Sequence, residues 1–220
     1  MRGPERGLSF FMRLVNAYID GFNFYYRAVK NTPWKWLDFS KLCELYLPAD
    51  CKLQTINYFT ANVSAMPFDL DAPSRQQIFL RALRTIPNLI ITYGKFQTHT
   101  ARMRLVNPPP SGPATVEVYS TREKGSDVNL ATTLLVDSFR KACDVALVIS
   151  SDSDLLLPVQ TARRDFKMQV GLISPSKQIA REMRLAANFV KVVRQGALSA
   201  SQFPISLTDA TGPFTKPPSW

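Results

Sequence analysis

The chain has 220 residues, of which 45% are hydrophobic and 20% are charged, as expected for one globular α/β domain. Its apolar runs are all broken well before the roughly 18 to 20 uncharged residues that a membrane-spanning helix needs, so we expect a soluble protein without membrane contact. The 27 Lys and Arg residues exceed the 17 Asp and Glu residues, which gives a net charge of +10. This excess favours a polyanionic partner, nucleic acid first, although basic charge also serves solubility alone.

The start of the chain and its cysteines carry no strong signal. Residues 1–11 are predicted to be an N-terminal extension, because they lack the apolar core and cleavage site of a secretory signal, and Met12 is an alternative start. Cys43, Cys51 and Cys143 are odd in number and have no CxxC spacing, which favours neither a disulfide framework nor a zinc site. A reducing cytoplasm is the expected location.

Short runs rich in Val, Ile, Leu and Tyr alternate along the chain with stretches of helical periodicity, which predicts βαβ units around a mainly parallel sheet. In chain order, we predict a strand at 13–19, a helix at 38–47, a strand at 52–60, a helix at 73–86, strands at 89–96 and 115–121, a helix at 126–142, a strand at 144–150, a helix at 158–164, a strand at 168–174 and a helix at 176–187. The basic, Pro-rich segment from His99 to Pro113 is predicted to be a surface loop or flap. Residues 12–195 form the expected domain, and residues 196–220 an expected tail packed on it.

Aspartates follow three of the predicted strands. Asp20 ends the first apolar run, Asp127 opens the helix after the fourth strand, and Asp152 and Asp154 follow the fifth. Each one alone suits a helix cap or a turn. Because the carboxyl ends of parallel strands meet at one edge, all four are expected to converge, and their mutual repulsion calls for a cation.

The ligand chemistry predicts the kind of cation. Mg²⁺ and Mn²⁺ prefer oxygen ligands, which the aspartates and Asn23 offer, whereas the only histidine, His99, falls in the predicted flap. Zinc chemistry and a Ser-His triad therefore lack their usual components. Neither a P-loop nor a dinucleotide-binding glycine motif is present. Metal-activated water that hydrolyses a phosphate ester is the expected chemistry.

Three stretches of sequence resemble the NYN-domain family: YIDGFNFYY at 18–26, EKGSDVNLA at 123–131 and VISSDSDLLLPV at 148–159. The NPPPSGP segment and the closing KPPSW are similar to a bacterial, LabA-like subgroup. The resemblance implies a PIN-like Rossmannoid three-layer sandwich and a metal-dependent ribonuclease. We expect an RNA endonuclease, while the sequence itself leaves endonucleolytic and exonucleolytic cleavage open. The resemblance also implies that Asp20, Asp127, Asp152 and Asp154 are the catalytic and metal-binding residues.

Basic and polar residues around these aspartates are predicted to bind the substrate. The predicted set is Asn23, Arg102, Arg104, Arg122, Lys124, Ser126 and Ser151. Lys124 is favoured for stabilising transition-state charge, against the alternative of a solvated lysine. Tyr25, Tyr26, Trp34 and Trp36 are interleaved with basic residues and either pack in the core or stack unpaired bases, so single-stranded RNA is the favoured partner.

A second interpretation stays open at this point. A PIN-like module of the same fold could bind RNA, or regulate another protein, without cleaving anything. The four aspartates argue for catalysis, because a binding module has no need of them all.

Overall fold

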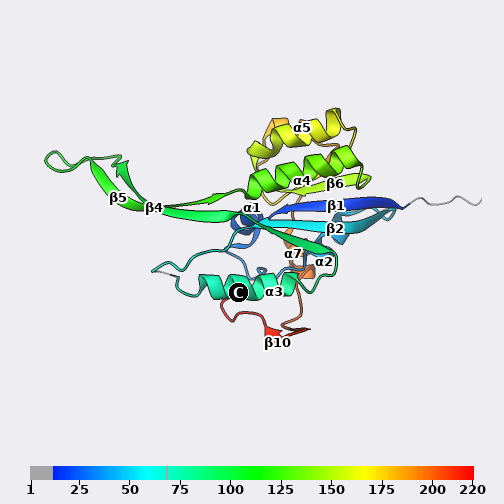
Figure 1. Cartoon of the computed structure of the whole chain (residues 1–220), viewed down its shortest axis with the longest axis horizontal. Helices are drawn as coiled ribbons and strands as arrows, with labels where there is room; N and C mark the ends of the chain where they lie inside the picture. Colours follow the sequence, from blue (N-terminus) through cyan, green and yellow to red (C-terminus); the bar gives the residue numbers. More distant parts are fainter. Residues whose placement is uncertain (1–11, 68) are drawn as a thin grey trace, which may run out of the picture.

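The computed structural model describes residues 12–67 and 69–220, so the expected N-terminal extension, residues 1–11, lies outside the described part. A single six-stranded sheet forms the centre, with helices on both of its faces (Figure 1). Its strand order is β3-β2-β1-β6-β7-β8, and every neighbouring pair is parallel. The strands are β1 (Arg13–Asp20), β2 (Cys51–Thr60), β3 (Leu89–Tyr93), β6 (Val145–Ile149), β7 (Gln169–Ser174) and β8 (Phe189–Val192). The three layers confirm the predicted fold class.

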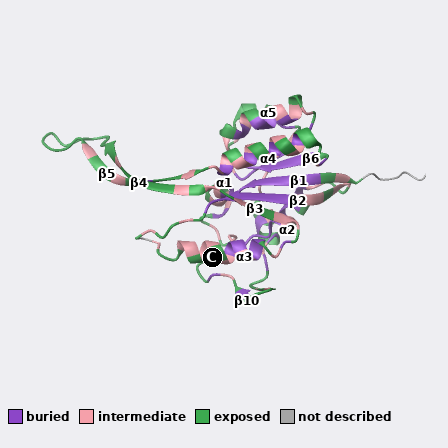
Figure 2. Ribbon diagram, viewed as in Figure 1, coloured by how far each residue is buried: buried purple, intermediate pink, exposed green. Residues whose placement is uncertain are grey.

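Burial of both faces explains why the central strands are apolar. Along β1, Val15, Ala17 and Ile19 face one core, and Tyr18 faces the other. All five residues of β6 are buried. A parallel strand covered by helices on both sides needs such an uninterrupted apolar run, because neither face meets water. Figure 2 shows these strands as the buried centre of the molecule.

The helices divide between the two faces. Residues of α2, α3 and α7 pack in the core that contains Val15, and residues of α4, α5 and α6 pack in the core that contains Tyr18. The helices are α1 (Gly21–Phe24), the single π-helical turn η1 (Tyr25–Val29), α2 (Phe39–Tyr46), α3 (Ala72–Leu83), α4 (Ser126–Arg140), the 3₁₀ turn η2 (Ser153–Leu155), α5 (Leu156–Arg164), α6 (Arg181–Ala186) and α7 (Gln195–Ala200). Among the described residues, none of these helices has the length and apolarity of a membrane span.

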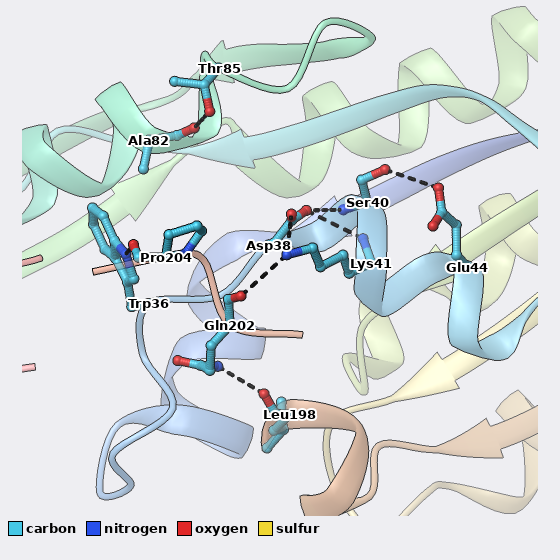
Figure 3. A network of polar contacts seen from close by, with 10 residues as sticks. All are labelled: Trp36, Asp38, Ser40, Lys41, Glu44, Ala82, Thr85, Leu198, Gln202 and Pro204. Atoms are coloured by element: carbon cyan, nitrogen blue, oxygen red, sulfur yellow. Dashed lines mark hydrogen bonds and ion pairs between the residues drawn. The ribbon is translucent and has the colours of Figure 1, made fainter. Parts of the chain in front are cut away.

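The segment after α7 packs along the Val15 core. Trp36 is 1% exposed, and its indole N–H donates to the Pro204 carbonyl at 2.8 Å (Figure 3). Asp38 caps α2 by accepting from the Ser40 N–H, in the same network. A short hairpin follows, made of β9 (Ser206–Asp209) and β10 (Gly212–Thr215), and Arg81 of α3 holds it through a bidentate pair with Asp209 at 2.7 Å.

A two-stranded antiparallel ribbon extends away from the layers (Figure 1). It consists of β4 (Lys95–Arg104) and β5 (Thr115–Lys124), joined by a Pro-rich loop, and most of its residues are exposed. One prediction was therefore wrong, because the strand predicted at 115–121 joins this ribbon instead of the parallel sheet. The segment predicted as a surface loop or flap from His99 to Pro113 lies at the surface, and its first residues form the end of β4. The polar alternation of β4 leaves it no apolar face for the core, which explains its position outside the sheet.

The last third of the domain also departs from the predictions. The helix predicted at 176–187 begins only at Arg181, because Ser174 and Ser176 form a hydrogen-bonded turn first. The four-residue β8 was not predicted. Its sequence is short and carries Lys191, so it gives little periodic signal.

Candidate metal centre

The order in which successive strands join the sheet reverses at β1, which makes the carboxyl ends of β1 and β6 the switch point of the sheet. From β1 the sheet grows through β2 and β3 on one side, and through β6, β7 and β8 on the other. Such a reversal leaves a crevice outside the carboxyl ends of the two central strands, where open α/β sheets bind their ligands. Asp20 is the last residue of β1, and Asp152 follows β6 within three residues. The topology therefore places both aspartates at one crevice.

Three carboxylates meet at this crevice. Asp20, Asp127 and Asp152 each offer an oxygen, and these oxygens lie within 4.8 Å of one another. Asp127 lies in the first turn of α4, and the strand before it, β5, belongs to the antiparallel ribbon and not to the parallel sheet, so this carboxylate reaches the crevice by a route that the sequence did not predict. Asp20 is 4% exposed, and the other two are half-buried. An oxygen-only set at this spacing suits a divalent cation such as Mg²⁺ or Mn²⁺.

Hydrogen bonds fix the orientation of the Asp20 carboxylate. Its Oδ1 accepts from the Asn23 backbone N–H at 2.9 Å, and its Oδ2 accepts from the Ser150 hydroxyl at 3.0 Å. The Ser150 oxygen in turn accepts from the Asp152 N–H at 3.0 Å, so one serine connects two of the three aspartates. Ser150 is completely buried. Sequence reasoning missed it, although its place directly after β6, in front of Asp152, was an available signal.

Asn23 holds the loop after β6. Its side-chain Oδ1 accepts from both the N–H and the hydroxyl of Ser151, each at 2.9 Å. This contact joins the turn after β1 to the turn after β6 across the crevice. Asn23 and Ser151, which were predicted to bind substrate, thus have partners within the protein, and both help to position the carboxylates.

The charges of the three aspartates work against one another. The pKa of Asp20 is raised to about 6, by burial first and then by the negative charges of Asp127 and Asp152, against the two hydrogen bonds that lower it. The pKa of Asp127 is also raised, by burial first and then by Asp152, Glu123 and Asp154. A bound cation would remove this repulsion, so the cluster is costly to the fold without one.

Asp154 stands apart from this group. It is exposed, it is not among the three carboxylates that meet, and its N–H donates to Asp152 Oδ1 at 2.9 Å. Glu123 caps α4, because its Oε1 accepts from the N–H and the hydroxyl of Ser126 at 3.0 and 2.8 Å. Ser126, predicted to bind substrate, is only 2% exposed and is used in this cap.

Basic side chains lie in the crevice and at the base of the ribbon beside it. Arg27 of η1 lines the hollow of about 220 Å³ that contains Asp20, Asp127 and Asp152. Lys124 and Arg122 lie at the base of the ribbon, which packs on α1 through the edge-to-face pair of Phe22 and Phe96, with ring centroids 5.2 Å apart. Lys124 lies three residues before Asp127. Arg27 was not in the predicted set, although it lies seven residues after Asp20.

Arg102 and Arg104 lie in the distal half of β4, where the register of the ribbon places them opposite Glu117 and Thr115 of β5. The ribbon places them away from the layers of the domain (Figure 1). They therefore lie apart from the crevice, on a surface that a long polymer would reach and a small substrate would not.

The family model of the NYN domain matches residues 15–193. The chain belongs to the NYN-domain family. This match confirms the resemblance seen in the sequence, and the NYN domain points to a nuclease superfamily. The three carboxylates at the switch point add a candidate divalent-metal site to that assignment.

Two individual proteins are similar to this NYN domain. The 6-hydroxy-3-succinoylpyridine 3-monooxygenase HspA of Pseudomonas putida (strain DSM 28022 / S16) is 27% identical over 234 aligned positions, which cover 94% of this chain and 75% of that protein. The crystal structure of a protein of unknown function from Vibrio parahaemolyticus RIMD 2210633 matches with a TM-score of 0.55 and 13% identity, covering 84% of this chain and 95% of that one. At that identity the second likeness shows the fold alone.

Proposed function

We propose that the protein is a ribonuclease that depends on Mg²⁺ or Mn²⁺ and cuts single-stranded RNA as an endonuclease. The observation that carries the proposal is the meeting of Asp20, Asp127 and Asp152 oxygens within 4.8 Å at the switch point of an NYN domain. When bound there, a divalent ion lowers the pKa of a coordinated water and neutralises charge on a phosphate. The net charge of +10 supports a polyanionic substrate.

Three aspartates are proposed to bind the metal, and neighbouring residues are proposed to position them. Asp20, Asp127 and Asp152 are the proposed ligands, and Asp154 is proposed to add negative charge behind them, because it raises the pKa of Asp127 without joining the group. Asn23, together with the buried Ser150, would hold the Asp20 carboxylate at a fixed angle. This fixed angle lets the site accept a cation without rearranging, which keeps the cost of binding low.

The basic residues are proposed to hold the phosphates. Arg27 lies in the same hollow as the three aspartates, so it is placed for the scissile phosphate. Lys124, three residues before Asp127, is proposed to stabilise the charge that develops in the transition state, and Arg122 would contact a flanking phosphate. Arg102 and Arg104 would contact more distant phosphates of the RNA, further along the ribbon. Contacts of this kind add affinity without sequence preference.

The test is cleavage of an end-labelled single-stranded RNA in Mg²⁺, in Mn²⁺ and in EDTA. We expect cleavage in either metal and none in EDTA, and a loss of about a hundredfold or more in Asp152→Asn. Asp165→Asn, the same substitution at an exposed site at the end of α5, is the matched control and should cut like the wild type. Equal cleavage by Asp152→Asn would overturn the assignment of the metal ligands. RNA binding without cleavage in every metal would favour the non-catalytic module instead.

One observation favours a second candidate, the conversion of a small aromatic acid. The Pseudomonas relative is named for action on a succinoylpyridine, and this chain has an aromatic cavity of about 290 Å³ beside the acidic crevice. Lys30 and Lys35, which line that cavity, suit a carboxylate. Tight binding of hydroxypyridine carboxylates, together with no measurable affinity for RNA, would favour this candidate over the nuclease.

A further inference from the structure

An aromatic cavity of about 290 Å³ lies between α1, η1, the end of β2 and the start of α3. Eight aromatic side chains line it. They are Phe22, Phe24, Tyr25, Tyr26, Phe39, Tyr58, Phe79 and Trp220. A cavity whose walls are aromatic on several sides favours a flat ring that can stack between them.

The cavity adjoins the acidic crevice. Phe22 and Tyr26 line both hollows, so the two share a wall that follows directly after Asp20 and Gly21 in the chain. Gly21 makes this arrangement possible, because a Cβ at that position would lie 2.7 Å from the Tyr58 ring and from the Phe59 carbonyl oxygen. A ligand seated in the cavity would therefore have its next group beside the three aspartates.

One hydroxyl and two ammonium groups line the cavity without a hydrogen bond or an ion pair among the described residues, and the Lys30 Nζ lies 4.9 Å from the centroid of the Tyr26 ring. Tyr58 is only 6% exposed, and its hydroxyl has no hydrogen-bond partner within residues 12–67 and 69–220. Lys30 and Lys35 line the cavity, and neither forms an ion pair with a described carboxylate. Arg75, by contrast, is neutralised by Asp69 at 2.5 Å. The cavity thus offers one unpartnered hydroxyl to a polar ring edge and two ammonium groups to an anion.

The rim of the cavity is held in place. Gln76 of α3 donates to the Ala61 carbonyl at 2.8 Å and accepts from the Val63 N–H at 2.9 Å, which fixes the chain after β2. Phe79 and Trp220 pack with ring centroids 5.3 Å apart on the far side. A preformed cavity loses little conformational entropy when a ligand enters.

We propose that this cavity receives one unpaired base of the RNA strand, next to the phosphate that is cut. The proposal rests on the proposed ribonuclease function and adds how the enzyme selects single strands. The aromatic walls would stack on the base, Tyr58 would hydrogen-bond its edge, and Lys30 and Lys35 would hold the adjoining phosphate. A base within a duplex would first have to be unstacked and unpaired, at a cost that a single strand largely avoids.

Binding of RNA that carries 2-aminopurine at successive positions tests the proposal, since the fluorescence of this base falls when it stacks. The experiment uses Asp152→Asn protein in EDTA, so that it does not depend on cleavage. We expect strong quenching at one position of a bound oligonucleotide. Ala72→Trp, which fills the cavity from the start of α3, should abolish that quenching and weaken binding by between about fivefold and about a hundredfold.

Two further variants make the result specific. Ser74→Trp places the same ring on the exposed side of the same helical turn, outside the cavity, and should bind like its parent. Lys35→Gln keeps the cavity open and should weaken binding without shifting the quenched position. It also keeps the proposal testable if Ala72→Trp fails to fold, which circular dichroism would reveal.

The outcomes separate this proposal from the nuclease. Metal-dependent cleavage, with no quenching at any position and no effect of Ala72→Trp, would overturn the base pocket and leave the nuclease intact. Position-specific quenching without cleavage in any metal would support the pocket and overturn the nuclease. Complete displacement of RNA by free hydroxypyridine carboxylate at low concentration, with no quenching in its absence, would assign the cavity to a small aromatic acid and contradict the proposal.

Discussion

Replacing Asp20 by asparagine is expected to stabilise the protein in the absence of metal. The pKa of Asp20 is raised from 3.8 to about 6 by burial and by neighbouring carboxylates. The folded protein therefore keeps a proton that the unfolded chain has lost between these two pH values, and its stability falls as the pH rises through that window. Above it, the ionised carboxylate costs the folded state about 3 kcal/mol.

The amide recovers most of this cost but not all of it. The single oxygen of the substituted side chain can accept only one of the two hydrogen bonds that Asn23 and Ser150 donate to Asp20, and the lost bond is worth about 1 kcal/mol. The net gain for Asp20→Asn is about 2 kcal/mol, which for a domain of this size raises Tm by about 4 to 8 °C. The same variant should lose the stabilisation that Mn²⁺ gives to the wild type.

Thermal unfolding in EDTA at about pH 7.5 and at about pH 4 measures both effects. At the lower pH the wild-type carboxyl is largely protonated, so the advantage of Asp20→Asn should disappear or reverse slightly. Asp165→Asn serves again as the control, and its Tm should equal that of the wild type at both pH values. A variant that is less stable than the wild type at about pH 7.5, or an advantage that does not change with pH, would refute the charge repulsion inferred for this site.

Three further substitutions test the surroundings of the site. Gly94→Ala should destabilise the fold by about 1 to 3 kcal/mol in urea unfolding, because its Cβ would collide with Glu123 Oε1 and displace the cap of α4. Changing Arg102 and Arg104 together to Gln should weaken RNA binding and flatten its salt dependence, lowering the slope of log K against log salt by about 1.4. Lys124→Ala should lower kcat by more than it raises the Kd for RNA, since a charge aimed at the transition state acts mainly on turnover.

Each of these substitutions has an outcome that contradicts the expectation. Unchanged stability of Gly94→Ala would show that Glu123 and the Lys124 carbonyl, which the added Cβ would approach to 2.7 Å, can both move without cost. An unchanged salt slope after the two arginine substitutions would remove the ribbon from the RNA path, and Glu117→Gln on the same ribbon controls for a general change in its structure. Equal effects of Lys124→Ala on kcat and on Kd would reduce this lysine to a binding residue.

The central sheet was predictable because its strands consist of uninterrupted apolar runs. Strands such as β6, with five buried residues in a row, suit only a layer covered on both faces. The same reasoning failed for β5, whose residues alternate without a core to face. Nothing in the sequence tells a strand of a free ribbon from a strand at the edge of a sheet, so the direction and the partner of β5 came only from the structure.

The site was predictable in composition but not in arrangement. Asp20 and Asp152 follow from the rule that parallel strands end at one edge, and the apolar runs before them reveal the strands. Asp127 reaches the same place from the ribbon side, which the strand rule does not explain. The cavity beside Tyr58 depends on contacts between residues more than 30 positions apart, and such contacts leave no local pattern. Ser150 also acts through a distant contact, with Asp20, but its place directly after β6 was a local signal.

The most direct test of the central claim is to compare the ends of the RNA products from wild-type protein and from Asp152→Asn over a Mn²⁺ titration. If water activated at the three carboxylates attacks the phosphate, cleavage should rise with Mn²⁺ and vanish in Asp152→Asn. The products should then carry no 2′,3′-cyclic phosphate, because the neighbouring 2′-hydroxyl is not the nucleophile. Cleavage that needs no metal, gives cyclic phosphate ends and persists in Asp152→Asn would contradict the account.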